Sequence, residues 1–296
     1  MLKRAIDHVE KFRRLLEAFN RRTARAEIER FHDRLRASDP NNLALSGYSV
    51  YSQGDEDGIL DEILRRLETS RGTFLEIGVG DGRENNTAYL LAKGWRGTWV
   101  DANSKQISQI RRALAPLIAT SQLRVFEMLV GPENVSTLKD QFCASHPIDV
   151  FSLDIDGVDF HVATALFADP SFRPKVVIVE YNGVFPPPLE FVMPLDAPAW
   201  HAGDYFGASY SAWVRFFALH GFKPVSCSTP GSNIFFVRDE LARRVLPSLP
   251  DESMLYRPAR YDLIAGFRGG HPRSYEALVS VAAASANTVA HSIAGR

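Results

Sequence analysis

Between about residues 50 and 240, the spacing of hydrophobic residues switches repeatedly between short apolar runs and a helical period. Short apolar runs predict buried strands, and apolar residues three or four positions apart predict helices. The predicted strands cover residues 73–78, 97–101, 122–128, 149–154, 175–181, 222–227 and 233–238. The predicted helices cover residues 55–69, 85–93, 104–115, 134–144, 158–167 and 208–220. This alternation is typical of a parallel sheet with helices on both faces.

The last two predicted strands are joined by Ser228-Thr229-Pro230-Gly231. This connection is too short for a crossover helix, so the two strands must be antiparallel. The sequence therefore predicts an α/β, Rossmann-like fold. Its seven-stranded, mostly parallel sheet ends in a C-terminal antiparallel hairpin.

The two ends of the chain have a different pattern. Residues 1–37 carry a helical stripe of apolar residues among charged ones, with eleven Lys/Arg against six Asp/Glu. We expect a solvated helix packed on the domain or on a second subunit, which allows a homo-oligomer. Its positive charge leaves an acidic partner or a membrane surface as alternatives. The predicted organisation is an N-terminal helical extension (1–45), a Rossmann-like domain (46–245) and a C-terminal helical tail (246–296).

Composition narrows the class of protein. The chain has 296 residues, 45% of them hydrophobic and 23% charged, with a formal net charge of −1. This profile is typical of a globular protein without a nucleic-acid partner. Cys143 and Cys227 show no disulfide or zinc spacing, which favours a reducing, cytoplasmic location. No apolar run approaches the length of about 18 residues that a membrane span needs, so stable membrane insertion is not expected.

A glycine-rich turn follows the first predicted strand. The segment Phe74-Leu75-Glu76-Ile77-Gly78-Val79-Gly80-Asp81-Gly82 is an apolar strand that runs into alternating glycines. Glycines permit a positive-φ turn and let the backbone approach a ligand at the carboxyl edge of a sheet. A dinucleotide-binding loop would have a third glycine where this chain has Arg83.

Carboxylates near this turn indicate the charge of the ligand. Glu76 and Asp81 lie where the diphosphate of a dinucleotide would sit, and they suit a cationic ligand better. S-adenosylmethionine carries an ammonium and a sulfonium. Asp101 ends the next strand about 20 residues later, the distance at which a carboxylate binds ribose hydroxyls. The residues that we expect to hold this donor are Glu76, Gly78, Gly80, Asp81, Asn86, Asp101 and Asp154.

A second group of acids closes the fourth and fifth strands. Asp154 and Asp156 follow the fourth strand, and Glu180 and Asn182 follow the fifth. Because the carboxyl ends of parallel strands meet at one edge, these four side chains predict an oxygen-ligand site for Mg²⁺. Such a metal would hold vicinal hydroxyls of a sugar-like acceptor, with Asp156 acting in catalysis. The alternative is that the acids contact the methionine part of the cofactor or cap helices, and that no metal binds.

A long, proline-rich loop over residues 183–207 contains several aromatic residues. Its length favours a lid or an acceptor pocket over a plain connector. His201 in this loop is a candidate general base, because a hydroxyl acceptor must lose a proton as it attacks the methyl group. His161 is the competing candidate.

Taken together, these motifs resemble the FkbM-like family of class I S-adenosylmethionine-dependent methyltransferases. The similarity covers roughly residues 50–240. The matching segments are 52–58, 74–78, 85–87, 94–97, 152–157, 180–182, 205–209 and 232–237. The resemblance implies methyl transfer to oxygen, commonly on a sugar, glycan or natural-product hydroxyl.

The resemblance also bears on the metal. Sugar O-methyltransferases similar to macrocin O-methyltransferase hold magnesium with acids at the fourth and fifth strand ends. This chain departs from that pattern at Asn182, where a second acid would stand beside Glu180, and at Val158, where the family carries Asn. Two other classes stay open. One is a glycosyltransferase that uses the Asp154-Ile155-Asp156 pair to bind a metal and a nucleotide sugar. The other is a non-catalytic assembly module.

Overall fold

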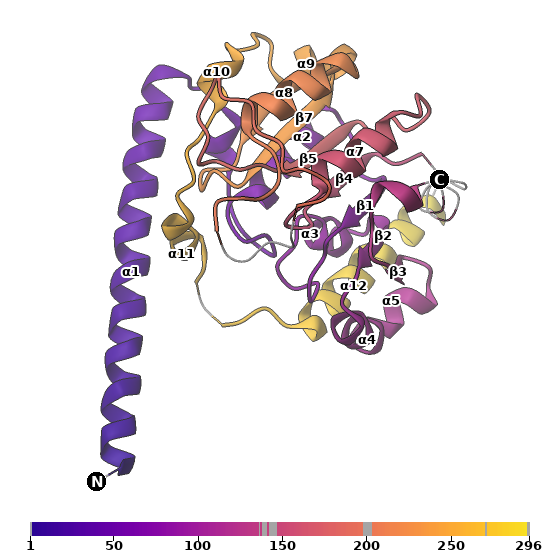
Figure 1. Ribbon diagram of the computed structural model, residues 1–296. Coiled ribbons are helices and arrows are strands. Elements are labelled where there is room, and N and C mark those ends of the chain that lie inside the picture. Colours follow the sequence, from indigo (N-terminus) through magenta and orange to yellow (C-terminus); the bar gives the residue numbers. More distant parts are fainter. Residues whose placement is uncertain are drawn as a thin grey trace.

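A seven-stranded sheet forms the centre of the protein (Figure 1). The computed structural model describes residues 2–294 except 136, 138–140, 142–146, 198–202 and 270. The strand order is β3-β2-β1-β4-β5-β7-β6. The strands are β1 (Thr73–Ile77), β2 (Arg96–Asp101), β3 (Leu123–Glu127), β4 (Val150–Leu153), β5 (Val176–Glu180), β6 (Phe222–Cys227) and β7 (Asn233–Arg238). β1 to β5 are parallel, and β7 is antiparallel to both β5 and β6. The predicted sheet and its closing hairpin are confirmed.

Helices cover both faces of the sheet, and each face has its own apolar core. Side chains alternate between the faces along a strand, so Phe74 packs in one core and Leu75 in the other. The first core includes side chains from α2 (Glu56–Arg66), α3 (Ala88–Ala92), α4 (Ser104–Ala113), α5 (Ala115–Ala119), α9 (Asp239–Val245) and α12 (Tyr275–Ala294). The second includes side chains from α7 (Asp159–Phe167), α8 (Tyr210–Leu219) and α10 (Glu252–Leu255).

Three predicted helices have different ends in the structure. α2 stops at Arg66, and Glu68 beyond it has a left-handed φ of 55°. α3 starts only at Ala88, because the backbone N–H groups of Asn86 and Thr87 bind Glu76 instead of continuing a helix. The helix predicted over residues 104–115 is two helices, α4 and α5, with a proline in the first turn of α5. Most of the predicted helix 134–144, including Cys143, lies outside the described residues.

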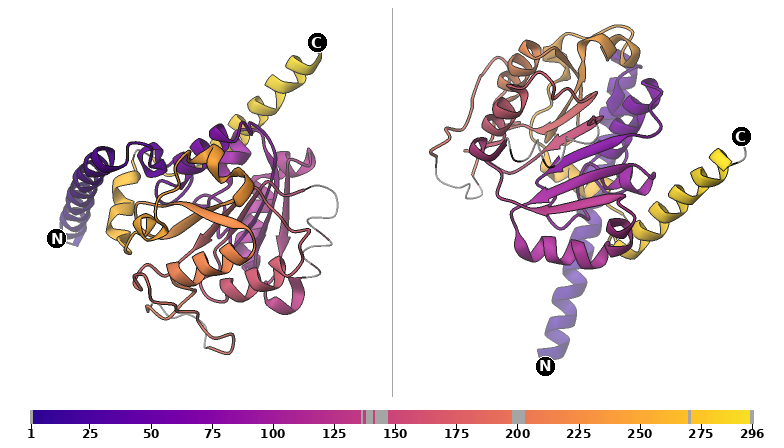
Figure 2. Two further views of the ribbon diagram at one scale, coloured as in Figure 1. Left: turned by 90° about the horizontal axis from the view of Figure 1, so that it is seen from above. Right: turned by 90° about the vertical axis from the view of Figure 1, so that its right-hand side faces the viewer.

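The N-terminal helix α1 (Leu2–Ser38) is one continuous helix whose two halves have different surroundings. Ala24, Ile28 and Leu35 are buried, and the first two pack with Leu263 of the short helical turn η3 (Tyr261–Leu263). The first half of the helix extends beyond the body of the protein (Figures 1 and 2). It carries the exposed apolar side chains Val9, Phe12, Leu15, Leu16 and Phe19. At 3.6 residues per turn, this exposed stripe lies about 135° around the helix axis from the buried one.

The segment after β7 is part of the folded body. α11 (Ile264–Phe267) packs against α1, and Gly266 lies so close that a side chain there would meet Ile28. Arg25 donates a hydrogen bond to the carbonyl oxygen of Gly266 at 3.1 Å. Further along, α12 buries Tyr275, Leu278 and Ala282 in the first core. Among the described residues, no helix combines the length and apolar character that crossing a bilayer requires.

Candidate cofactor and catalytic cleft

A cleft of about 1270 Å³ opens at the carboxyl edge of the parallel strands. Residues at the ends of β1, β2, β3, β4 and β5 form one side of it, and residues of α1 and of the segment after α11 form the other. Single-ligand pockets usually measure about 300–1,000 Å³. This cleft therefore has room for a cofactor and a second molecule together.

The glycine turn forms the floor of the cleft. Gly78, Gly80 and Gly82 all have positive φ angles, of 88°, 55° and 73°. A Cβ at Gly78 would lie 1.5 Å from the carbonyl oxygen of Asp154, so only glycine lets the turn approach β4 this closely. A Cβ at Gly80 would meet no atom within 4 Å, because this residue faces open space. The turn thus leaves at Gly80 the free volume that a close-lying ligand needs.

Two of the predicted donor-binding acids line this part of the cleft. Asp101 Oδ2 accepts a hydrogen bond from the backbone N–H of Gly80 at 2.8 Å, and its Oδ1 accepts one from Asn103. The carboxylate is held at the cleft wall with lone pairs left for a ligand. Asp81 also lines the cleft, but it forms an ion pair with Arg83, so its charge is already compensated.

Glu76 and Asn86 are close to the glycine turn, but neither lines the cleft. Glu76 is 2% exposed, and its carboxylate accepts hydrogen bonds from Asn85, from the backbone N–H of Asn86, and from both the N–H and the hydroxyl of Thr87. Asn86 donates its side-chain amide to Ser152. The prediction that these two residues contact the donor is therefore not supported. They fix the loop that follows the glycine turn.

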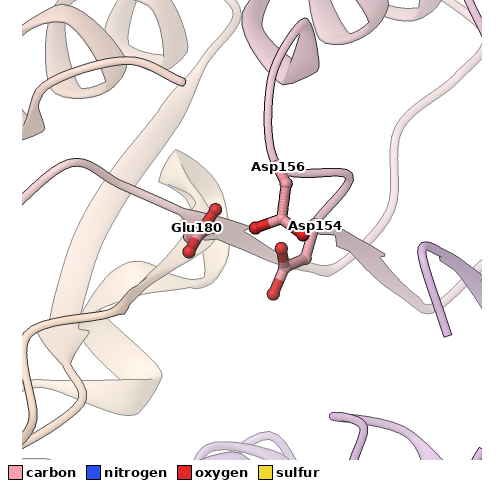
Figure 3. Close-up of side chains that lie close together, drawn as sticks. All are labelled: Asp154, Asp156 and Glu180. Carbon is pink, nitrogen blue, oxygen red and sulfur yellow. The ribbon is translucent and has the colours of Figure 1, made fainter. Parts of the chain in front are cut away.

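Asp154, Asp156 and Glu180 converge at the ends of β4 and β5 (Figure 3). One carboxylate oxygen from each lies within 4.8 Å of the others. Asp159 holds the turn between β4 and α7, because its carboxylate accepts the N–H groups of Ile155 and Gly157 at 2.8 and 2.9 Å. Asp156 has a φ of 56°, which is uncommon for a residue with a side chain and often marks a functional site. Oxygens at this separation suit a hard divalent cation.

The electrostatics of this group require a positive partner or a shared proton. Burial, followed by the negative charges of Asp159 and Asp156, raises the pKa of Asp154 well above its ordinary value. Burial and then the charge of Asp154 raise the pKa of Glu180 in the same way. Burial also raises the pKa of Asp156. Three ionised carboxylates this close are costly, and either a cation or a proton between Asp154 and Glu180 would relieve the repulsion.

Asn182 is not a member of the acidic group, which corrects the predicted ligand set. Its side chain is fully buried, and its Nδ2 donates to the carbonyl oxygens of Asp204 and Phe206 at 2.7 and 3.1 Å. Its Oδ1 accepts the backbone N–H of Val184 at 3.2 Å. Asn182 therefore shapes the long loop and has no free oxygen to offer a metal.

Of the two histidines predicted as general bases, the structure describes only His161. His161 does not line the cleft, and its Nε2 bonds the carbonyl oxygen of Met193 at 2.8 Å. His201 lies outside the described residues, so its role stays a prediction. No described residue of the loop 183–207 lines the cleft, contrary to the expected acceptor pocket. In its described part the rings of Phe185, Phe191 and Tyr205 pack on one another.

Sequence reasoning missed the opposite side of the cleft, which we term the cap wall. It is basic, whereas the strand ends are acidic, and its residues come from α1, from the end of α11 and from the segment after α11. Its members are Arg21, Phe267, Arg268, Gly269, His271, Pro272 and Arg273. No local motif marks these residues, and only the packing of α1 on α11 brings them to the cleft.

The strand order with a reversed β7 defines a Rossmann-like, class I methyltransferase fold. No family model matches the chain, and no curated protein matches it. The resemblance to FkbM-like enzymes therefore stays a prediction.

Several solved structures are similar to this chain, with low sequence identities and low TM-scores. The glycopeptide N-methyltransferase MtfA complexed with S-adenosylmethionine is 18% identical, covers 56% of this chain and 81% of its own, and has a TM-score of 0.36. A precorrin-6y C5,15-methyltransferase from Geobacter metallireducens GS-15 is 14% identical over 60% of this chain and 85% of its own, with a TM-score of 0.38. TrmK of M. capricolum, solved with S-adenosylhomocysteine, is 11% identical over 58% of this chain and 66% of its own, with a TM-score of 0.35. Scores this low do not carry a function over to this chain.

Proposed function

We propose that this protein is an S-adenosylmethionine-dependent methyltransferase that methylates a hydroxyl oxygen of a sugar, glycan or natural product. The observation that carries the proposal is the cleft floor. Gly80 leaves open space beside Asp101, whose carboxylate is fixed by the N–H of Gly80 itself. This arrangement suits a nucleoside whose ribose hydroxyls bind a strand-end acid.

The residues present fit the donor in four places. Asp101 would accept the ribose hydroxyls, and Met128, Leu129 and Val130 would provide an apolar surface for the adenine ring. Gly78 and Gly80 would pass beneath the nucleoside. The strand-end acids provide negative charge for its ammonium. When bound, the donor supplies an activated methyl group on its sulfonium.

The acidic group would organise the acceptor. Asp154, Asp156 and Glu180 provide either ligands for a divalent cation or a carboxylate that accepts the proton of the acceptor hydroxyl. In both cases the chain lowers the barrier mainly by holding the acceptor oxygen in line with the methyl group. Asp156 is the most exposed of the three and the best placed to touch the acceptor.

Calorimetric titration of S-adenosylmethionine into the purified, cofactor-stripped protein tests the donor. We expect binding that Asp101→Asn weakens roughly tenfold or more, since a hydrogen bond to a charged group is lost. Asp196→Asn, an exposed change of the same kind away from the cleft, is the matched control. An absence of heat with the unaltered protein at millimolar ligand would contradict the proposal.

The same titration distinguishes a metal from a shared proton. If a metal binds, Mg²⁺ alone should release or absorb heat with the unaltered protein and none with Asp154→Asn. If UDP-sugars with Mn²⁺ stabilise the protein against heating while S-adenosylmethionine does not, the glycosyltransferase alternative is favoured. That class would use the same Asp154 and Asp156 pair but would leave the glycine turn without a role.

A further inference from the structure

The cap wall contains positive charge that the protein itself does not neutralise. Arg21 is half-buried and lines the cleft, yet it forms no hydrogen bond or ion pair with any residue that the structure describes. Arg268 pairs through Nη2 with Glu84, but its Nε is buried and has no partner among the described residues. A buried, unsatisfied donor on a charged side chain costs free energy. When such a donor lies in the wall of a cleft, a bound ligand would supply the missing hydrogen-bond acceptor.

The remaining charges on this wall are already used. Arg273 donates to Ser49 Oγ and to the carbonyl oxygens of Val50 and Ser52, and it shares Glu84 with Arg268. On the glycine-turn side of the cleft, Arg83 is paired with Asp81. The acids near the wall, Asp81 and Glu84, therefore already form ion pairs with Arg83, Arg268 and Arg273. Arg21 lines the cleft without an anion from the described chain, and the Nε of Arg268 is buried within the cleft wall without a partner.

Arg21 is held toward the cleft by the docking of α1. It lies one turn before Ala24 and Arg25, and therefore on the helix face that packs against α11. Gly266 permits this close packing, because a side chain there would meet Ile28, Arg25 and Ala24. Arg22, the next residue, is exposed and does not line the cleft.

We propose that Arg21 and Arg268 form a subsite for an anionic group, a carboxylate or a phosphate, of a ligand bound in this cleft. A guanidinium binds both groups with directed, charge-assisted hydrogen bonds. The identity of this ligand rests on the proposed function, which offers two molecules that could carry the anionic group. The anion is either the carboxylate of S-adenosylmethionine or an acidic group on the acceptor.

Arg21→Gln and Arg22→Gln in the full chain provide a matched pair. Both remove one positive charge from neighbouring positions of α1, and only Arg21 lines the cleft. Equal melting temperatures for the two variants will show that the fold is kept. The probes are S-adenosylmethionine, its decarboxylated analogue, and inorganic phosphate added in the presence of S-adenosylhomocysteine, each followed by calorimetry.

We expect Arg21→Gln to weaken at least one anionic probe roughly tenfold, while Arg22→Gln changes none. Weaker binding of S-adenosylmethionine with unchanged binding of the decarboxylated analogue identifies the cofactor carboxylate. Unchanged binding of both with weaker phosphate binding identifies an acidic acceptor. Arg268→Lys, which keeps the charge but loses Nε, should weaken the same probe.

Equal affinities of the Arg21 and Arg22 variants for every probe would overturn the subsite. Failure of the proposed function is recognised separately. In that case the unaltered protein binds neither S-adenosylmethionine nor its decarboxylated analogue. Phosphate titrated alone then still tests Arg21.

Discussion

Gly78 and Gly80 lie two residues apart in the same turn, but a side chain would meet different surroundings at each. Gly78→Ala places a methyl group against the carbonyl oxygen of Asp154, in addition to the cost of its positive φ. We expect it to lower the free energy of unfolding by about 3 kcal/mol or more. Gly80→Ala should lower it by only about 1–2 kcal/mol, the cost of a positive φ for a residue with a side chain. Urea denaturation measures both.

For ligand affinity, in contrast to stability, we expect the substitution at Gly80 to have the larger effect. Gly80→Ala puts a methyl group into the open space where we place the nucleoside, so a folded Gly80→Ala protein should lose affinity for S-adenosylmethionine. An unchanged calorimetric affinity would show that the ligand does not approach Gly80.

Asp55 is a fully buried acid outside the cleft. It accepts hydrogen bonds from the backbone N–H and the hydroxyl of Thr229, in the turn between β6 and β7. Burial, followed by the charge of Glu56, raises the pKa of Asp55 from 3.8 to about 7. Between these values the folded state keeps a proton that the unfolded state releases. This group therefore favours folding at low pH, and its contribution is lost as the pH rises from about 4 to about 7.

Asp55→Asn should remove this dependence on pH. Melting temperatures of the unaltered protein and the variant, measured from pH 4 to pH 8, should converge or cross as the pH rises. A single proton contributes at most about 1.4 kcal/mol per pH unit. Asp196→Asn, at an exposed position, should leave the slope unchanged. Parallel curves for Asp55→Asn and the unaltered protein would contradict the assignment.

How far the site can be read from the sequence depends on each residue's surroundings. Asp154, Asp156 and Glu180 follow from strand register alone, since parallel strand ends share an edge. Glu76 and Asn182 have suitable positions, but their polar atoms are taken up by loops whose folding no local pattern reveals. Arg21 and Arg268 could not be found in this way, because they meet only through the packing of α1 on α11.

Among the elements, strands were predicted more reliably than helix ends. The inner strands β1, β4, β5 and β7 come from apolar runs buried on both faces, a signal that neighbouring loops do not alter. Helix starts depend on competing hydrogen bonds, as at α3, where Glu76 captures the N–H groups of Asn86 and Thr87. The helix α1 was predicted correctly, whereas the exposure of its first half could not be read from periodicity.

The first half of α1 tests the expectation of a homo-oligomer. Val9, Phe12, Leu16 and Phe19 alternate in steps of three and four residues, the spacing of a coiled-coil seam, and Phe12 is 69% exposed. We expect the full chain to form a dimer that Phe12→Glu converts to a monomer. Light scattering coupled to size-exclusion chromatography measures the mass. Lys11→Glu, on the polar face of the helix, should leave the dimer intact, and a monomeric unaltered chain would contradict the expectation.

At the scale of the whole molecule, α12 joins residues after 274 to the first core, although the sequence suggested only a helical tail. Leu278 is 1% exposed, whereas Val281 on the same helix is 50% exposed. Leu278→Ala should lower the free energy of unfolding by about 2–5 kcal/mol, and Val281→Ala by less than about 0.5 kcal/mol. Urea denaturation checks the pair. Similar small values for both would show that α12 separates from the body in solution.

The two sides of the cleft are made at different times during synthesis. The strand ends that bear the acids are complete once β5 has emerged from the ribosome, whereas Arg268 follows nearly ninety residues after Glu180. Arg21 is made early, but α11, against which its part of α1 packs, is made more than two hundred residues later. A chain that ends before α11 would therefore carry the acidic strand ends without the basic cap wall opposite them.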